Sequence, residues 1–520
     1  MPISGPEWRS IREILEEKLE FRSLRPGQKE ALEAVLQGTD TLAVLPTGSG
    51  KSAIYQISAL MIPGPTVIVS PLIALQVDQL QAIRESELGE AALVNSLQPA
   101  QQRDEALTSL SQDELEFLLL SPEQLANPAT LEKVKASRPS LFVVDEAHCI
   151  SEWGHSFRPD YLRLGKVIAE LGHPVTLALT ATASREVRQE IIERLGLRDP
   201  RVIVTGFDRP NIHLEVRGLT GEALKTRSLC ALLQELPGSG IVYVATRAHA
   251  ESVAAALLAT GRSAAAYHAG MKRDERMQRQ SAFMSGGIDV MVATSAFGMG
   301  IDKPDVRFVI HYDVSESIDA YYQEVGRAGR DGLPARAVLF FSERDLNLKR
   351  FFTGRTKLAS SELDLVLGAL RAASGPLSLS ELLQQTRLTK AKVNRALTRL
   401  EDQGVLERDG AGAATLSAGA ERDLKRMVGA ALEAQAALGE RNRERIEEMR
   451  RYARARSCRR ELLLAHFGAR LEGACAGCDN CAHPPAERSK VRVKKPALPP
   501  SARAAHVTTA APSATTLDVA

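Results

Sequence analysis

A run of seventeen residues, Asp145–Tyr161, combines two kinds of side chain that could do chemistry on a nucleotide and on nucleic acid. It begins with the adjacent carboxylates Asp145 and Glu146, which are suited to holding a metal–nucleotide complex. It continues into an aromatic and basic loop, although aromatic residues make up only 4% of the chain. Aromatic rings stack on bases, and cationic groups contact phosphates. A hydrophobic loop packed beneath a sheet would not explain the acidic pair. The candidates for nucleic-acid contact and coupling are Ser151, Trp153, His155, Phe157 and Arg158.

A glycine-containing turn lies between an apolar run and a helix-like segment. Backbone N–H groups of such a turn, together with a helix N-terminus, attract phosphates, and glycine permits their close approach. We expect Lys51 to reach the β and γ phosphates and Ser52 to bind Mg²⁺. Asp145 would hold the same ion, and Glu146 would orient and deprotonate the attacking water. The strict pattern has glycine where this chain has Leu45, but the variant PTGSGKS is typical of helicase-type ATPases. The turn comprises Thr47, Gly48, Ser49, Gly50, Lys51 and Ser52.

A second basic segment, Gln323–Gly332, carries Arg327 and Arg330 three positions apart among glycines. We expect both side chains to project from one face of a helical turn. An arginine delivered from a partner domain can stabilise the charge that develops during phosphoryl transfer. The alternative is an exposed basic helix.

Four late cysteines, Cys458, Cys475, Cys478 and Cys481, end in a C-x₂-C-x₂-C run. Four thiolates can form a closed tetrahedral zinc site. An iron–sulfur cluster is the rival interpretation, since it also takes four thiolates.

The elements that must position these residues form two similar series. Apolar runs at 41–46, 66–70, 117–121, 141–147 and 175–181 predict buried strands separated by helices. A second series follows at 240–245, 263–268, 289–294, 306–313 and 335–341. Both predict parallel α/β sheets. The acidic pair then lies at the carboxyl edge of the first sheet, where ligands of such sheets bind.

Residues 359–418 predict three helices and a strand pair around a glycine-rich tip, which describes a winged helix. Thr389 is the expected N-cap of the third helix. The alternative is a helical insertion that packs against the core. An Arg- and Glu-rich helix at 422–457 follows. Nine arginines against three glutamates in Arg441–Arg460 suit either a solvated helix face or a phosphate-binding face.

The 520 residues allow three to four domains, and the net charge of +2 does not by itself indicate a polyanion partner. No apolar run is long enough for a membrane span, and the N-terminus has no secretory core. We therefore expect a cytoplasmic protein.

Taken together, the motifs resemble the RecQ family of superfamily 2 DNA helicases over about 20–345 and 440–485. The resemblance implies two tandem RecA-like domains, at 1–205 and 206–345, with ATP, Mg²⁺ and Zn²⁺ as cofactors. It implies that Phe21 stacks on adenine, that Arg25 and Gln28 belong to the same motif with Gln28 reading the base, and that Gln323 contributes to nucleotide binding. Arg330 would be the arginine finger, supported by Arg327. Further strand-contacting or interdomain motifs contain Ser70, His268 and Thr294.

The resemblance implies 3′ to 5′ unwinding of duplex or branched DNA in recombination and repair, with single-stranded-DNA-binding and repair proteins as further partners. One departure is the winged-helix-like domain at 346–420, which precedes the helical hairpin and zinc module at 421–484 instead of following it. The tail at 485–520 is expected to be disordered. Two other functions stay open: a DEAH-type RNA helicase, and an ATP-gated DNA-binding regulator that reads DNA with the winged helix.

Overall fold

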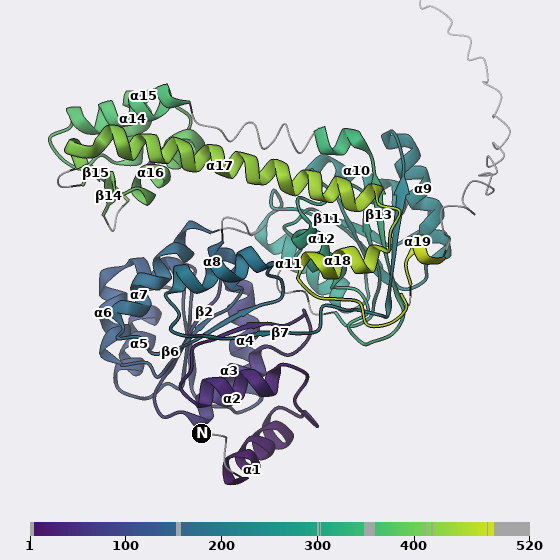
Figure 1. The fold of residues 1–520 in the computed structure, drawn as a ribbon, viewed down its shortest axis with the longest axis horizontal. Helices are drawn as coiled ribbons and strands as arrows, with labels where there is room; N and C mark the ends of the chain where they lie inside the picture. Colours follow the sequence, from purple (N-terminus) through teal and green to yellow (C-terminus); the bar gives the residue numbers. More distant parts are fainter. Residues whose placement is uncertain are drawn as a thin grey trace, which may run out of the picture.

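The computed structural model describes residues 5–151, 158–298, 301, 303–347, 359–409, 412–417, 420–475 and 477–482. The predicted contacts Trp153, His155 and Phe157 lie outside the described residues, as does the predicted disordered tail. The described parts form two α/β lobes, a small domain beside them and one long helix that joins this domain to the second lobe (Figure 1).

Lobe 1, residues 5–204, is built on a parallel sheet of seven strands in the order β3-β4-β2-β5-β6-β1-β7. The central strands are short apolar runs buried on both faces, as a parallel sheet covered by helices requires. The strands are β1 Thr41–Val44, β2 Thr66–Val69, β3 Ala91–Val94, β4 Phe117–Leu120, β5 Leu141–Val144, β6 Val175–Thr180 and β7 Arg201–Val204. The helices are α1 Gly5–Glu13, α2 Gln28–Leu36, α3 Ser52–Met61, α4 Ile73–Glu85, α5 Ala100–Ser111, α6 Pro128–Ala136, α7 Leu164–Glu170 and α8 Arg185–Leu195. Ile14–Lys18 is a π-helical segment, and Pro122–Ala126, Ala147–Ile150 and Pro159–Arg163 are 3₁₀ turns.

Lobe 2, residues 212–347, has a parallel sheet of six strands in the order β10-β11-β9-β12-β13-β8. Its strands are β8 Ile212–Gly218, β9 Ser239–Tyr243, β10 Ala264–Tyr267, β11 Val290–Ala293, β12 Val306–His311 and β13 Ala335–Phe341. Its helices are α9 Glu222–Glu235, α10 Arg247–Leu258, α11 Arg273–Met284 and α12 Ile318–Val325. The two parallel sheets confirm the predicted fold class. The sequence did not predict three of the strands, β3, β7 and β8.

The winged-helix domain, residues 359–417, has a hydrophobic core of its own. It comprises α14 Ser360–Ala372, α15 Leu379–Thr386, α16 Lys390–Asp402 and an antiparallel pair, β14 Leu406–Arg408 with β15 Ala414–Leu416. Thr389 is the N-cap of α16, although its side chain makes no capping hydrogen bond. The separate core and the antiparallel wing favour a winged helix over an insertion packed on the lobes. An ion pair of 2.6 Å between Arg163 and Glu401 joins this domain to lobe 1.

The zinc module, residues 420–482, begins with the 35-residue helix α17, Ala420–Arg454. It continues with α18 Arg459–His466 and α19 Asp479–Ala482. One end of α17 packs on the winged-helix core through Met427 and Leu432, and the other packs on the lobes through Met449 and Tyr452. At least six of the nine arginines in Arg441–Arg460 pair with carboxylates within the protein: Arg443, Arg450, Arg451, Arg454, Arg459 and Arg460. Much of this charge is therefore used in intramolecular ion pairs.

Candidate active site and metal centre

The phosphate turn lies between β1 and α3, where the sequence places it. Gly48 and Gly50 have φ angles of 78° and 73°, in the left-handed region that favours glycine. The N–H of Ser49 donates to the carbonyl of Pro46, and Lys51 Nζ lies 3.3 Å from the carbonyl oxygen of Leu45. Ser52 is the first residue of α3. The turn thus places its backbone and the start of a helix together, as a phosphate site requires.

Gln28 is the main support of this turn. Its side-chain Nε2 donates to the carbonyls of Ser49 and Gly50, both at 2.8 Å, and its Oε1 accepts from the N–H of Arg25 at 2.6 Å. The Arg25 guanidinium donates to the carbonyl of Gly48. Gln28 is 2% exposed, so its amide is used within the protein in this structure rather than presented to a base. Phe21, predicted to stack on adenine, is 38% exposed.

The acidic pair follows β5 directly, at the carboxyl edge of the sheet. Asp145 is buried and accepts a hydrogen bond of 2.9 Å from Gln79 on α4, a contact that the sequence did not predict. Burial and then the neighbouring Glu146 carboxylate raise the pKa of Asp145 to about 6, although Lys51 opposes the shift. Glu146 has a φ angle of 48°, a conformation that costs a residue with a side chain about 1–2 kcal/mol. Two closely spaced carboxylates with this excess of negative charge fit a divalent cation.

His148 connects the acidic pair to the end of β6. Its Nδ1 lies 2.9 Å from Thr180 Oγ1 and 3.2 Å from Glu146 Oε2. The imidazole is buried, which opposes protonation, but Cys149 and Glu146 together raise the pKa of His148 above its ordinary value. These two contacts link the Glu146 carboxylate to the end of β6.

The ends of the predicted aromatic loop are fixed in lobe 1. Tyr161 is fully buried, so it is a core residue and not a ring available to bases. Its hydroxyl donates to the carbonyl oxygen of Asp145 at 3.0 Å. Ser151 is also buried and donates to Glu190 on α8 at 2.5 Å. Arg158 donates to the carbonyl of Pro71. The loop that the sequence assigns to DNA is therefore attached at one end to the acidic pair.

Three other predicted contacts differ in their surroundings. Ser70 is buried, so its hydroxyl does not face solvent in this structure. Its backbone N–H donates to the carbonyl of Leu120 and does not face solvent either. His268 is 6% exposed, with Nε2 at 3.2 Å from Glu251. Thr294 is half-buried and lines a cavity of about 450 Å³. Four of the predicted residues line that cavity, one from lobe 1 and three from lobe 2: Arg158, Thr294, Gln323 and Arg327.

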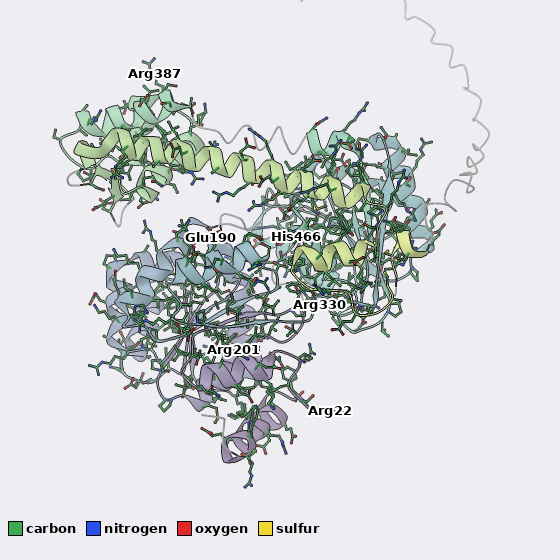
Figure 2. The ribbon with its side chains drawn as sticks, in the orientation of Figure 1. Arg22, Glu190, Arg201, Arg330, Arg387 and His466 are labelled. Carbon is green, nitrogen blue, oxygen red and sulfur yellow. The ribbon has the colours of Figure 1, made fainter. Side chains whose placement is uncertain are left out.

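The two arginines lie in a turn and not on a helix, which corrects the sequence interpretation. Helix α12 ends at Val325 with Gly326 as its C-cap, and Gly326–Gly332 forms successive tight turns, named here the arginine turn. A Cβ atom placed on Gly48 would lie 3.6 Å from the Cγ and Cδ atoms of Arg330. One on Gly326 would lie 3.9 Å from Thr47 Oγ1. The arginine turn of lobe 2 thus contacts the phosphate turn of lobe 1. Figure 2 labels Arg330 on lobe 2.

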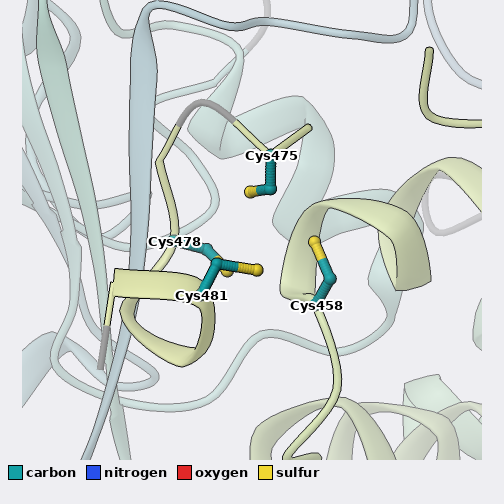
Figure 3. Close-up of side chains that lie close together, drawn as sticks. All are labelled: Cys458, Cys475, Cys478 and Cys481. Carbon is teal, nitrogen blue, oxygen red and sulfur yellow. The ribbon is translucent and has the colours of Figure 1, made fainter. Parts of the chain in front are cut away.

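The four late cysteines converge as the sequence predicts. Their sulfur atoms all lie within 4.8 Å of one another. Figure 3 shows Cys458 at the start of α18 facing the other three cysteines, which come from the segment that ends the module. Four sulfur donors at this spacing fit a tetrahedral ion, for which they would be the complete ligand set.

Family comparisons agree with this layout. Four family models match: DEAD/DEAH box helicase at residues 25–190, helicase conserved C-terminal domain at 224–332, IclR helix-turn-helix domain at 365–410 and RecQ zinc-binding at 421–482. The last match and the sulfur geometry confirm the prediction of zinc over an iron–sulfur cluster.

Two relatives are similar to about two thirds of this chain. The probable ATP-dependent DNA helicase RecS of Bacillus subtilis is 41% identical over 361 residues, which are 69% of this chain and 72% of that protein. The ATP-dependent DNA helicase RecQ of Pasteurella multocida is 42% identical over 334 residues, which are 64% of this chain. This chain spans 52% of the length of that relative.

Solved structures support the fold. The Mycobacterium smegmatis helicase Lhr, bound to single-stranded DNA and AMP-PNP, aligns with a TM-score of 0.53 at 22% identity, over 81% of this chain and 61% of that one. The helicase MrfA bound to DNA aligns with a TM-score of 0.57 at 17% identity, over 81% and 64%. At these identities the likeness shows the fold alone.

Proposed function

The chain belongs to the RecQ family of ATP-dependent DNA helicases, and on that premise we propose that it couples ATP hydrolysis to 3′ to 5′ movement on DNA and to duplex unwinding. Tailed, forked and branched duplexes in recombination and repair are the proposed substrates. The observation that carries the proposal is the contact between the phosphate turn of lobe 1 and the arginine turn of lobe 2, because a motor must bring both lobes onto one nucleotide.

We propose catalytic roles for residues of the phosphate turn, the acidic pair and the arginine turn. Lys51 would neutralise the β and γ phosphates, and Ser52 and Asp145 would hold Mg²⁺, which offsets phosphate charge when bound. Glu146 would accept the proton of the attacking water. Its contact with His148 supports this role by fixing the direction of the carboxylate. Arg330 would stabilise the charge on the transferring phosphoryl group, with Arg327 in support.

Coupling to DNA is proposed to run through the aromatic loop. Trp153, His155 and Phe157 would contact bases, and the loop joins the acidic pair through the backbone and through Tyr161. A change in the loop would then alter the position of Asp145, whose carbonyl oxygen accepts the Tyr161 hydrogen bond. Arg158 extends the same segment to the cavity between the lobes.

DNA is favoured over RNA because four relatives at 41–42% identity are all named DNA helicases. Single-stranded-DNA-binding and repair proteins remain proposed partners, and the cytoplasm is the proposed location. In the part of the chain that the structure describes, no helix combines the length and apolar character of a membrane span.

The direct test is unwinding of duplexes that carry a 3′ or a 5′ single-stranded tail, with Glu146→Gln as the inactive control. We expect ATP-dependent opening from the 3′ tail. Opening from the 5′ tail alone would refute the polarity, and ATPase stimulation by RNA but not by single-stranded DNA would refute the substrate. Footprints at specific duplex sequences without unwinding would favour a regulator that reads DNA with the winged helix.

A further inference from the structure

Arg460, in the zinc module, holds the linker between the two lobes, residues 205–211. Its guanidinium is 4% exposed, and it donates to Asp208 Oδ1 at 2.6 Å and to the carbonyls of Arg209 and Ile212, both at 2.7 Å. A further contact of 3.5 Å reaches the carbonyl of Gly477, between two zinc-site cysteines. One buried side chain therefore holds the linker at Asp208 and Arg209 and also the first residue of β8.

Arg209 in turn holds the arginine turn. Its guanidinium donates to the carbonyl of Gly326 at 3.1 Å and to those of Ala328 and Gly329 at 2.8 and 2.9 Å. Asn211 donates to the carbonyl of Gly329 as well, at 2.8 Å. The turn follows the end of a helix, where carbonyl groups lack helical partners, and the linker supplies those partners. The conformation of the turn that carries Arg330 thus depends on the position of the linker.

Aromatic packing joins the same three parts. Phe207 of the linker stacks on Phe467 of the zinc module, with ring centroids 4.6 Å apart, and Tyr322 of α12 packs on Phe467 at 4.7 Å. The Tyr322 hydroxyl donates to the carbonyl of Phe207 at 2.6 Å. The N–H of Leu214 on β8 donates to the carbonyl of Gly477. The zinc module is therefore packed on the linker and on the helix that leads into the arginine turn.

We propose that Arg460 is a positioning residue for ATP hydrolysis, which acts through Arg209 to hold Arg330 over the phosphate turn. This inference rests on the proposed function, because it requires that Arg330 stabilises the transition state. The zinc module then has a role at the nucleotide in addition to any role at DNA. Without Arg460, the linker and the start of β8 lose three short hydrogen bonds, and the arginine turn loses its fixed support.

The test is a mutant cycle on DNA-stimulated ATPase at saturating DNA. The variants are Arg460→Ala and Arg209→Ala, each alone and combined with Arg330→Ala. Arg470→Ala is the control, since Arg470 is an exposed arginine of the same module. Zinc content and circular dichroism are measured for every variant.

We expect Arg460→Ala and Arg209→Ala each to lower kcat roughly 10- to 100-fold, the size of effect that a misplaced catalytic group produces. The KM for ATP should change by less than about threefold, because a finger acts in the transition state. In the Arg330→Ala background, neither substitution should lower kcat further, since its effect passes through Arg330. A residue needed only for folding would instead lower activity in both backgrounds.

Wild-type kcat in Arg460→Ala, or an equal further loss in the Arg330→Ala background, would overturn the inference while leaving the proposed function intact. If Arg330→Ala itself retains kcat, the assigned finger fails and the inference fails with it. If Arg460→Ala loses zinc, Arg209→Ala decides, because Arg209 lies outside the zinc module. Normal kcat in that variant would overturn the inference.

Discussion

Replacement of Gln28 by alanine separates two roles for this side chain, support of the phosphate turn and recognition of adenine. The substitution removes three hydrogen bonds, two to the carbonyls of Ser49 and Gly50 and one from the N–H of Arg25. At about 0.5–1.5 kcal/mol for each bond, the free energy of unfolding of lobe 1 should fall by about 1.5–4.5 kcal/mol. Gly50 has a left-handed backbone conformation and no side chain of its own, so residue 50 supplies no side-chain contact to replace the lost hydrogen bonds.

The unfolding of lobe 1 can be followed by itself. The chain contains two tryptophans, Trp8 and Trp153, and both belong to the sequence of lobe 1. Denaturant titration with tryptophan fluorescence should show an earlier transition in Gln28→Ala. Gln37→Ala is the matched control, since Gln37 is exposed at the end of the same helix.

The nucleotide assay completes the test. If Gln28 supports the turn, the KM values for ATP, GTP and CTP should all rise by a similar factor, because all three nucleotides share the phosphates. Unchanged stability together with a loss confined to ATP would refute this reasoning and would favour a side chain that leaves the turn to read the base.

Four further outcomes are expected. Glu146→Gln should bind ATP normally and lose hydrolysis, because only the proton acceptor is removed; equilibrium binding with single-turnover hydrolysis checks this, and retained turnover would refute the assignment. Trp153→Ala should keep basal ATPase activity and lose most of its stimulation by single-stranded DNA, and full stimulation would contradict the proposed coupling. Tyr161→Phe should lower the free energy of unfolding by about 1–3 kcal/mol, because the buried carbonyl of Asp145 loses its donor, and a wild-type denaturation curve would argue against that bond. Cys478→Ser should release zinc and destabilise the module, measured by metal analysis and proteolysis; full metal content would exclude Cys478 as a ligand.

The three strands that the sequence misses all lie at sheet edges, and of the four edge strands of the two parallel sheets only β10 was predicted. β3 and β7 are the outer strands of the first sheet, and β8 is an outer strand of the second. These three strands are partly exposed, and β7 and β8 contain charged residues, unlike the apolar run of a strand buried on both faces. The position of each is set by pairing with a distant strand, which local composition does not encode.

The site was predictable where its chemistry is local and unpredictable where it depends on tertiary contacts. Thr47–Ser52 and the acidic pair each follow a buried strand, so residue order places them at one sheet edge. The turn that carries Arg330 was taken for a helix, although its glycines at short intervals favour turns. The contacts of Gln28 with Gly50 and of Tyr161 with Asp145 join residues many positions apart, and no spacing pattern marks them.

Helix α17 gives the molecule a lever arm. At 1.5 Å per residue its 35 residues extend about 50 Å, from the winged-helix core at one end to the lobes and zinc module at the other (Figure 1). A tilt of about 5° at the zinc module would displace the far end by roughly 4–5 Å over that length. A displacement of this size would separate Arg163 from Glu401, which are 2.6 Å apart in this arrangement. A rotation of lobe 2 by a few degrees would therefore be enough to break this contact between the winged-helix domain and lobe 1.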